Sequence, residues 1–328
     1  MSLCPLRATG SVRDRKVCDM KYALNRGLLL AGLSVALSAG MAGVFAGSAG
    51  ADGGSWDDSD DHRSWERSCR YYSDYDREGR RDGLKAIGLT DDQKLIKFDV
   101  DRPDDACKIG KVWLSDDNKL VGIDYRVQNE RLYGVGDKGG IYLLSTRDAS
   151  AKKVSKLTVD LDGKYFGVDF NPAADRLRVI SDKGQNLRHN LNDDTTVKDG
   201  NLTYPPSKDT ARGVTGAAYT NNDLDPDTAT TLFDIDTNLD QVAVQSPANT
   251  GQLAATGKLG VDAGIQAGFD IYSIVRDDKT VYNKGFAVLQ VNGRSKLYEI
   301  DMLTGEADKQ GTFYDYKVID LALPLGQL

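Results

Sequence analysis

A short phrase of hydrophobic and polar positions recurs along this chain at a nearly fixed interval. Two hydrophobic residues flank one intervening residue, and a small polar residue follows them; in the third copy His189 takes the second hydrophobic position. The polar member of the phrase stands at Asp99, Ser145, Asn190, Asp236 and Asp301. The steps of 46, 45, 46 and 65 residues match the length of one four-stranded propeller blade, with an insertion in the last.

A second phrase keeps the same interval and predicts the innermost strand of each blade. It reads Gly-x-Asp in three copies, Val318-Ile319-Asp320 in another, and Gly216-Ala217-Ala218 without the aspartate in the fifth. We expect inner strands that start near residues 121, 166, 215, 267 and 317. The long step leaves room for a short sixth blade, but residues 272–290 add strand-like sequence without a second copy of the first phrase.

The two ends of the repeat region predict how the ring closes. A C-terminal strand at residues 317–323 would join N-terminal strands at 84–89, 94–100 and 108–114. The sequence therefore predicts an all-β fold, a β-propeller of five four-stranded blades. Such closure hides the sheet edges that would otherwise pair with other chains, and we expect a monomer.

An apolar leader precedes the repeats. Residues 28–46 are rich in Gly, Ala and Leu, follow Lys21 and Arg26, and precede an Ala49-Gly50-Ala51 cleavage pattern. These features assign residues 1–51 to a secretory signal peptide, and we expect translation of that peptide to start at Met20. A retained membrane anchor would need a more hydrophobic core. We therefore expect a secreted, extracellular protein that is not inserted in a membrane after cleavage.

The mature chain has two predicted parts, an acidic, aromatic-containing flexible tail at residues 52–83 and the propeller domain at 84–328. Loss of the leader removes six of 42 basic and two of 49 acidic residues, which leaves a net charge of −11. That charge argues against nucleic acid and anionic membranes as partners. Cys69 and Cys107 remain as an even pair in an oxidising location, so we expect a disulfide.

Several longer motifs occur in a fixed order. They are LVGIDYR with RLYGVG, then YFGVDFNPAADRLRVISDKGQNLRHN, AAYTNN, TTLFDID, QSPANTGQLAATGKLG and GFDI. On these motifs, residues from about 84 to 323 resemble a bacterial exported family known as domain of unknown function 4394. The resemblance implies export and a propeller-like fold, and no established activity. The chain departs from the family pattern in two places. The Pro-Asn loop reads Ser246-Pro247-Ala248-Asn249, and His189 stands where an aliphatic residue is typical. These departures put a role for the loop in doubt.

Four of the five inner strands carry an aspartate. The set is Asp124, Asp169, Asp270 and Asp320. If these carboxylates converge on the channel, their repulsion would require a cation such as Ca²⁺ or arginine partners, for which Arg126, Arg176 and Arg178 are available. The alternative is structural, since propeller aspartates also bond backbone groups within their own blade.

Two polar hairpins on one blade predict a ligand site. Asp169 to Arg176 places a turn between two strands, and Ser181 to Asn186 forms the next hairpin. Together they offer donors and acceptors suited to a sugar or a peptide. The candidate ligand-binding residues are Asn171, Asp175, Arg178, Gln185, Asn186 and Arg188. The same residue types also form turn networks that fix strand register.

Other chemistry has weaker signals. The acidic run from Asp223 to Asp227, with Asp234 at the twelfth place, imitates a calcium loop but lacks its Gly and Glu. The mature chain has only His62 and His189, no G-x-S-x-G motif and no zinc-ligand spacing. The sequence favours a module that binds or scaffolds an envelope or extracellular carbohydrate, peptide or protein over an enzyme. The alternatives are a hydrolase or lactonase with a divalent cation in the channel, and a structural module without a ligand.

Overall fold

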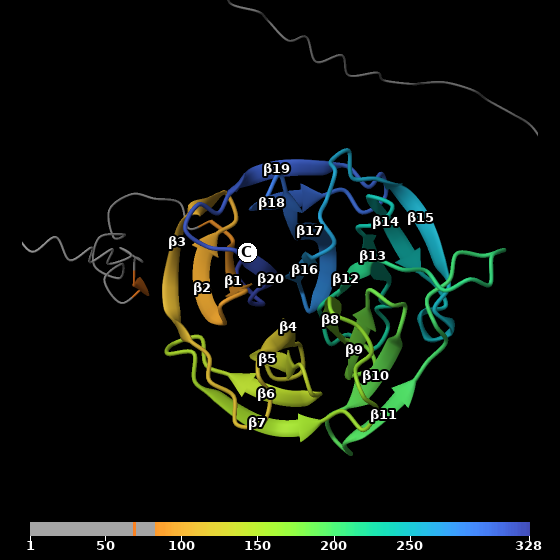
Figure 1. Cartoon of the computed structure of the whole chain (residues 1–328), viewed down its shortest axis with the longest axis horizontal. Helices are drawn as coiled ribbons and strands as arrows, with labels where there is room; N and C mark the ends of the chain where they lie inside the picture. The colour runs from red at the N-terminus through yellow and green to blue at the C-terminus, as the bar shows by residue number, and fades with distance from the viewer. Residues whose placement is uncertain (1–67, 70–82) are drawn as a thin grey trace, which may run out of the picture. The chain divides into compact units, whose positions relative to one another are not determined.

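The computed structural model describes residues 68–69 and 83–328, which form five four-stranded antiparallel sheets arranged in a ring (Figure 1). In each blade the strands are ordered from the innermost strand, near the centre of the ring, to the outermost strand. The closing blade consists of β20 (Val318–Ala322), β1 (Lys85–Thr90), β2 (Lys94–Asp99) and β3 (Arg102–Lys111). The next blade consists of β4 (Leu120–Arg126), β5 (Arg131–Gly136), β6 (Gly140–Leu144) and β7 (Ala151–Lys156).

The remaining three blades repeat this order. The third consists of β8 (Phe166–Asn171), β9 (Arg176–Ser181), β10 (Asn186–Asn190) and β11 (Thr195–Lys198). The fourth consists of β12 (Val214–Tyr219), β13 (Leu232–Asp236), β14 (Gln241–Gln245) and β15 (Leu253–Lys258), with the 3₁₀ turn η2 (Ala248–Thr250) before β15. The fifth consists of β16 (Ala267–Arg276), β17 (Lys279–Val291), β18 (Arg294–Ile300) and β19 (Ala307–Thr312).

This arrangement confirms the predicted five-bladed β-propeller. Strand β20 pairs with β1 and closes the ring, so the two ends of the domain share one blade. The 65-residue step contains a long hairpin of β16 and β17 rather than a sixth blade. Its outer part contacts the loop after β12, where the Thr280 N–H donates to Asp223 Oδ2 at 2.9 Å and Asn283 Nδ2 donates to Asn221 Oδ1 at 2.8 Å.

The glycine of the Gly-x-Asp phrase has a packing reason, because the inner strands of neighbouring blades lie very close together. A Cβ on Gly122 in β4 would come within 2.4 Å of Val168 Cγ2 in β8. A Cβ on Gly268 in β16 would come within 2.4 Å of the Asp320 Cα in β20. Real Cβ contacts are never that short, so these positions exclude larger residues.

The hydrophobic core lies between adjacent blades, where the alternating residues of one sheet pack against the next. Phe98 of β2, for example, packs edge-to-face on Phe313 beyond β19 with ring centroids 5.0 Å apart. Tyr133 of β5 packs in the same way on Phe170 of β8, at 5.4 Å. The blades therefore hold one another in place, and the polar groups described below are exceptions to an apolar rule.

The predicted disulfide is present. Cys69 and Cys107 are bonded with an S–S distance of 2.09 Å, and Ser68 forms a parallel bridge with Lys108 on the outer strand β3. The predicted leader and, apart from residues 68, 69 and 83, the predicted tail lie outside the described residues. In the part of the chain that the structure describes, none of the helices has the length and apolar character needed to cross a membrane.

Candidate functional site

The inner-strand aspartates are buried and tie neighbouring blades together. Asp320 Oδ2 accepts a hydrogen bond from the Ile123 N–H of β4 at 2.7 Å. Asp124 Oδ2 accepts one from the Phe170 N–H of β8, also at 2.7 Å. Asp169 bonds the next inner strand, β12, and Asp270 bonds the chain just beyond β20. These bonds join neighbouring blades, and Asp124, Asp270 and Asp320 also accept the N–H of the next residue in their own strand, as a structural role requires.

Three of these aspartates also converge. Asp124, Asp169 and Asp270 offer carboxylate oxygens that all lie within 4.8 Å of one another, whereas Asp320 is not part of this group. Burial, and then the charges of the neighbouring aspartates, raise the pKa of Asp124 and Asp169 well above the usual carboxyl range. Oxygen ligands at this spacing are chemically suited to Ca²⁺. The geometry thus leaves the predicted cation site as a hypothesis.

The arginines expected to neutralise this ring bond elsewhere. Arg126 Nε donates to Asp175 Oδ1 at 2.7 Å, in the turn between β8 and β9. Arg176 Nη1 donates to the backbone carbonyls of Ala174 and Asp175. Arg178 points toward the fourth blade, as described next, so the carboxylates of the ring share no ion pair with these three cations.

The two polar hairpins of the predicted ligand site lie at opposite ends of the third blade, because consecutive turns of an antiparallel sheet alternate between its two ends. Asn171 and Asp175 belong to the β8–β9 turn, where Asp175 is used by Arg126. Gln185 belongs to the β9–β10 turn and bonds the backbone at Asp160 and Asp162. The six predicted residues therefore do not form a single pocket.

Three of the six nevertheless come together at one cavity between the third and fourth blades. The cavity has a volume of about 90 Å³. Its lining residues are Asn171, Ala174, Arg176, Arg178, Arg188, Tyr219 and Asn249. We call this site the arginine cavity, since it is lined by three arginines and no acidic residue.

Arg178 is the fixed centre of the arginine cavity and is almost fully buried. Its Nη1 donates to Asn186 Oδ1 and Asp199 Oδ2, each at 2.7 Å. Its Nε donates to the Tyr219 hydroxyl at 3.1 Å, and its Nη2 donates to Asn249 Oδ1 at 2.8 Å. Burial alone would lower the pKa of Arg178, but Tyr219 and Asp199 raise it, so the guanidinium stays charged.

Arg188 stands beside Arg178 and shares its counter-ion. Its Nε donates to the same Asp199 oxygen at 2.8 Å. Neither Nη group of Arg188 has a hydrogen-bond partner among residues 68–69 and 83–328, so four N–H donors remain available at a half-buried position. One carboxylate thus balances two guanidinium groups, and Arg176 adds a third. This arrangement suits an oxyanion such as a carboxylate, phosphate or sulfate.

The strand register shows what distinguishes the third blade. Arg178 lies directly opposite Asp169, and Arg188 lies opposite Arg178. The residues at the register position of Arg178 in the other blades are Leu89, Tyr133, Phe233 and Phe286. An alignment of the repeats on the inner-strand aspartate therefore singles out Arg178. The Pro-Asn loop, whose role was in doubt, supplies Asn249 to the same cavity.

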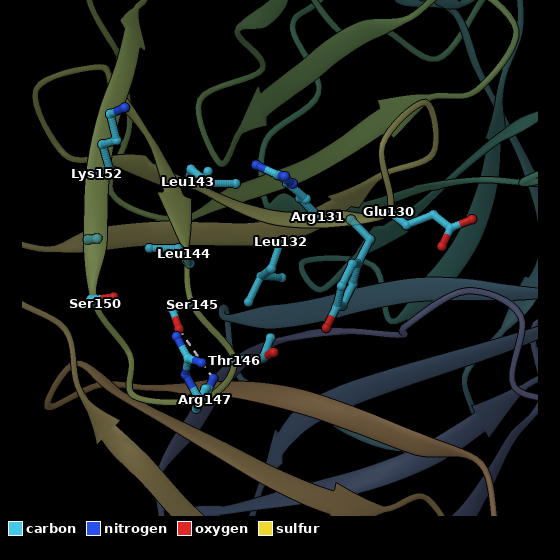
Figure 2. Close-up of a pocket in the computed structure, with 12 residues that line it drawn as sticks. Glu130, Arg131, Leu132, Leu143, Leu144, Ser145, Thr146, Arg147, Ser150 and Lys152 are labelled. Carbon is cyan, nitrogen blue, oxygen red and sulfur yellow. Dashed lines mark hydrogen bonds between the residues drawn. The ribbon is translucent and has the colours of Figure 1, made fainter.

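A second cavity, of about 620 Å³, lies on the second blade and was missed by the sequence analysis (Figure 2). Its charged lining residues are Glu130, Arg131, Arg147 and Lys152. Leu132, Leu143 and Leu144 lie between the cations, and the Glu130 side chain points away from Arg131. The cations come from separate strands and turns and follow no periodic pattern, so no sequence signal marks them. We call this site the blade-two cavity.

The acidic run after β12 does not gather into a calcium site. Asp223 Oδ2 accepts hydrogen bonds from the N–H and hydroxyl of Thr280, and Asp225 pairs with Lys279 at 3.1 Å. Asp234 is buried in strand β13. Among the described residues, the inner-strand group is the only set of three or more candidate ligands within 4.8 Å.

His189 is fully buried, as its periodic position predicts. Its ring nitrogens lie 2.8 Å from Ser155 Oγ and 2.9 Å from Thr196 Oγ1. Ser155 Oγ also donates to Asp194, so the hydroxyl and not the imidazole bridges the other two groups. A Ser-His-Asp triad needs the imidazole between the serine and the carboxylate, and this arrangement is therefore not a triad.

The fold and its cavities define a five-bladed β-propeller with cationic sites between and on its blades. Residues 94–322 match the model of the family described as Domain of unknown function (DUF4394), and the chain belongs to that family. Among curated proteins, none matches it.

Several solved structures are similar to parts of this chain. A structural genomics protein of unknown function from Bacteroides thetaiotaomicron is 13% identical with a TM-score of 0.44, over 74% of this chain and 65% of its own. An auxiliary nutrient binding protein from the same organism is 11% identical with a TM-score of 0.38, over 70% and 58%. Hydrazine synthase of Kuenenia stuttgartiensis is 12% identical with a TM-score of 0.37, over 61% and 51%. The chain thus spans about half to just under two thirds of their lengths.

Proposed function

We propose that this protein is an exported binding module that recognises an acidic group of an envelope or extracellular ligand in the arginine cavity. The observation that carries the proposal is the pair Arg178 and Arg188, which line one cavity and share a single ion-pair partner, Asp199, within the described part of the chain. The disulfide between Cys69 and Cys107 supports export, because disulfides persist in oxidising compartments.

The chemistry of the cavity supports an oxyanion more than a neutral sugar. Arg178 is held in place by four polar partners and costs no reorganisation when a ligand arrives. Arg188 presents both Nη groups, and a guanidinium fork matches the two oxygens of a carboxylate, phosphate or sulfate group. The volume of about 90 Å³ suits one such group and not a whole sugar chain.

The other two candidate functions have less support. A hydrolase would need a cation at the inner-strand aspartates, yet these carboxylates already accept backbone N–H groups from neighbouring blades. His189 offers no general base to a cavity, since it is buried between Ser155 and Thr196. A purely structural module would be expected to lack charged cavities, which argues against that alternative as well.

Calorimetric titration tests the proposal with inorganic sulfate, glucuronate and, as an uncharged probe, glucose. We expect sulfate or glucuronate to bind and glucose not to bind. Arg188→Gln keeps the Arg178–Asp199 pair, so the variant should fold, and it should lose about tenfold or more in affinity for the anion. The matched control is Arg212→Gln, which removes an exposed arginine outside the cavity. Absence of binding by either anion, or equal affinities of the two variants, would refute the proposal.

A further inference from the structure

The blade-two cavity has the marks of a second anionic site. Arg131, Arg147 and Lys152 line it, and none of these cations has an ion-pair partner within the described part of the chain. Exposed cations without partners are common on a surface, but here three of them border one cavity around an apolar floor of leucines (Figure 2). They are concentrated on a chain whose net charge is −7. The local charge is therefore opposite to that of the whole protein.

The acidic groups near this cavity offset its positive charge only in part. Glu130 is at its border and points away from Arg131 in Figure 2. Asp148 lies in the β6–β7 turn, where hydrogen bonds from the hydroxyls of Ser145 and Ser150 lower its pKa to about 2. This carboxylate is ionised and the charge of Arg147 also lowers its pKa, so it balances part of the local charge, and three cations face two carboxylates.

Both cavities lie on the same face of the propeller. The blade-two cavity is lined by residues of the β4–β5 and β6–β7 connections, and the arginine cavity by residues of the equivalent β8–β9 and β14–β15 connections. The first turns of the two blades touch, because Gln128 Nε2 donates to the Pro172 carbonyl at 2.7 Å. The Arg126–Asp175 pair adds a second link between them. The two cavities therefore lie at the same end of neighbouring blades.

Resting on the proposed function, we propose that the ligand is an acidic polysaccharide, whose repeated acid groups occupy the arginine cavity and the blade-two cavity together. Thr146 adds a hydroxyl group and the partly exposed Leu143 adds apolar contact, a combination that suits a sugar ring. Binding at two linked sites raises affinity without any new contact, since the second acid group is held at high effective concentration. Each cavity alone would bind a monomer weakly.

The experiment compares polygalacturonate with its monomer, galacturonate, on the full-length protein. The variants are Arg147→Gln with Lys152→Gln, which changes the blade-two cavity, and Lys208→Gln with Arg212→Gln as a control that removes one exposed lysine and one exposed arginine elsewhere. We expect the first double variant to lose about tenfold or more in affinity for the polymer and to keep wild-type affinity for the monomer. The control should match the wild type for both probes.

The outcomes separate this inference from the proposed function. If the polymer binds both double variants equally well, the blade-two cavity is not part of the site and the inference fails while the arginine cavity stands. If polyglutamate binds in a manner that depends on Arg147 and Lys152 and polygalacturonate does not bind, the ligand is an acidic peptide and the inference is overturned. If neither galacturonate nor its polymer binds the wild-type protein, both the inference and the carboxylate form of the proposed function fail.

Discussion

The buried aspartates predict that the protein becomes less stable as the pH rises from 5 to 7.5. Asp270 shows the reason most clearly. Its two oxygens accept hydrogen bonds from the Ile271 and Leu323 N–H groups, each at 2.6 Å, but burial raises its pKa to about 6. In the unfolded chain an aspartate has a pKa of 3.8. Between these values the folded state holds a proton that the unfolded state has released, so folding is favoured at low pH and loses that advantage as the pH passes 6.

The size of the effect follows from the difference between the two pKa values. A change from 3.8 to about 6 corresponds to on the order of 3 kcal/mol of unfolding free energy for Asp270 alone. Burial also raises the pKa of Asp124, Asp169 and Asp320, and their contributions have the same sign. His189 acts in the opposite direction, because burial lowers its pKa and favours the folded state as the pH rises through 6.5.

The assay is urea unfolding at pH 5.0 and pH 7.5 in the presence of EDTA, for the wild type and Asp270→Asn. The difference between the two proteins removes the contribution of His189. We expect the wild type to lose about 1.4 kcal/mol more than the variant across this range, because the part of the effect between pH 3.8 and pH 5 lies below it. A difference that does not change with pH would refute the reasoning. If calcium replaces EDTA and reverses the trend, the carboxylates are held ionised by a cation, as the alternative prediction for this site requires.

Three further predictions concern packing, cross-linking and a buried charge. Replacing Cys69 and Cys107 by alanine should lower the free energy of unfolding by on the order of 4 kcal/mol, because the disulfide closes a loop with a sequence separation of 38. Chemical denaturation measures this, and a loss below about 1 kcal/mol would contradict it. Gly122→Ala should lower the melting temperature by several degrees, since its Cβ would lie 2.4 Å from Val168 Cγ2; an unchanged temperature would show that the inner strands can separate. Asp234→Asn should stabilise the protein at pH 8 by on the order of 1 kcal/mol. Neither carboxylate oxygen of Asp234 has a hydrogen-bond partner in the described structure, and burial raises the pKa of this carboxyl group. Lower stability of the variant at pH 8 in a thermal melt would count against this.

The fold could be predicted because the repeat carries its own geometry. Each blade is a local unit of about 45 residues, and the close approach of inner strands demands a small residue at a fixed place, as at Gly122 and Gly268. The closing blade was predictable for a similar reason. Strand β20 carries the inner-strand aspartate, and the other three strands of its blade, β1, β2 and β3, come from the opposite end of the domain. The bounds of β3 were predicted less well, since the strand begins six residues earlier than expected.

The candidate site was only partly predictable, because its residues meet across blades that are far apart in sequence. Arg178 and Asn249 are 71 residues apart, and no spacing rule connects a β9 residue with a loop after β14. The polar hairpins suggested one pocket because they are adjacent in sequence, but an antiparallel sheet places them at opposite ends. The cations of the blade-two cavity come from an irregular turn and two strands, so only the folded chain brings Arg131 and Arg147 to one cavity.

The departure of the third blade from the repeat is the strongest reason to regard the arginine cavity as functional. At the register position of Arg178 the other blades place a leucine, a tyrosine or a phenylalanine, so the fold itself is satisfied by an apolar side chain there. A buried arginine costs several kcal/mol of desolvation, and its pairing with Asp199 does no more than offset that cost. Hydrophobic residues of similar volume would stabilise the blade equally well or better. The four hydrogen bonds of Arg178 link the third and fourth blades, and the ligand of opposite charge proposed above would account for a charged group at this position.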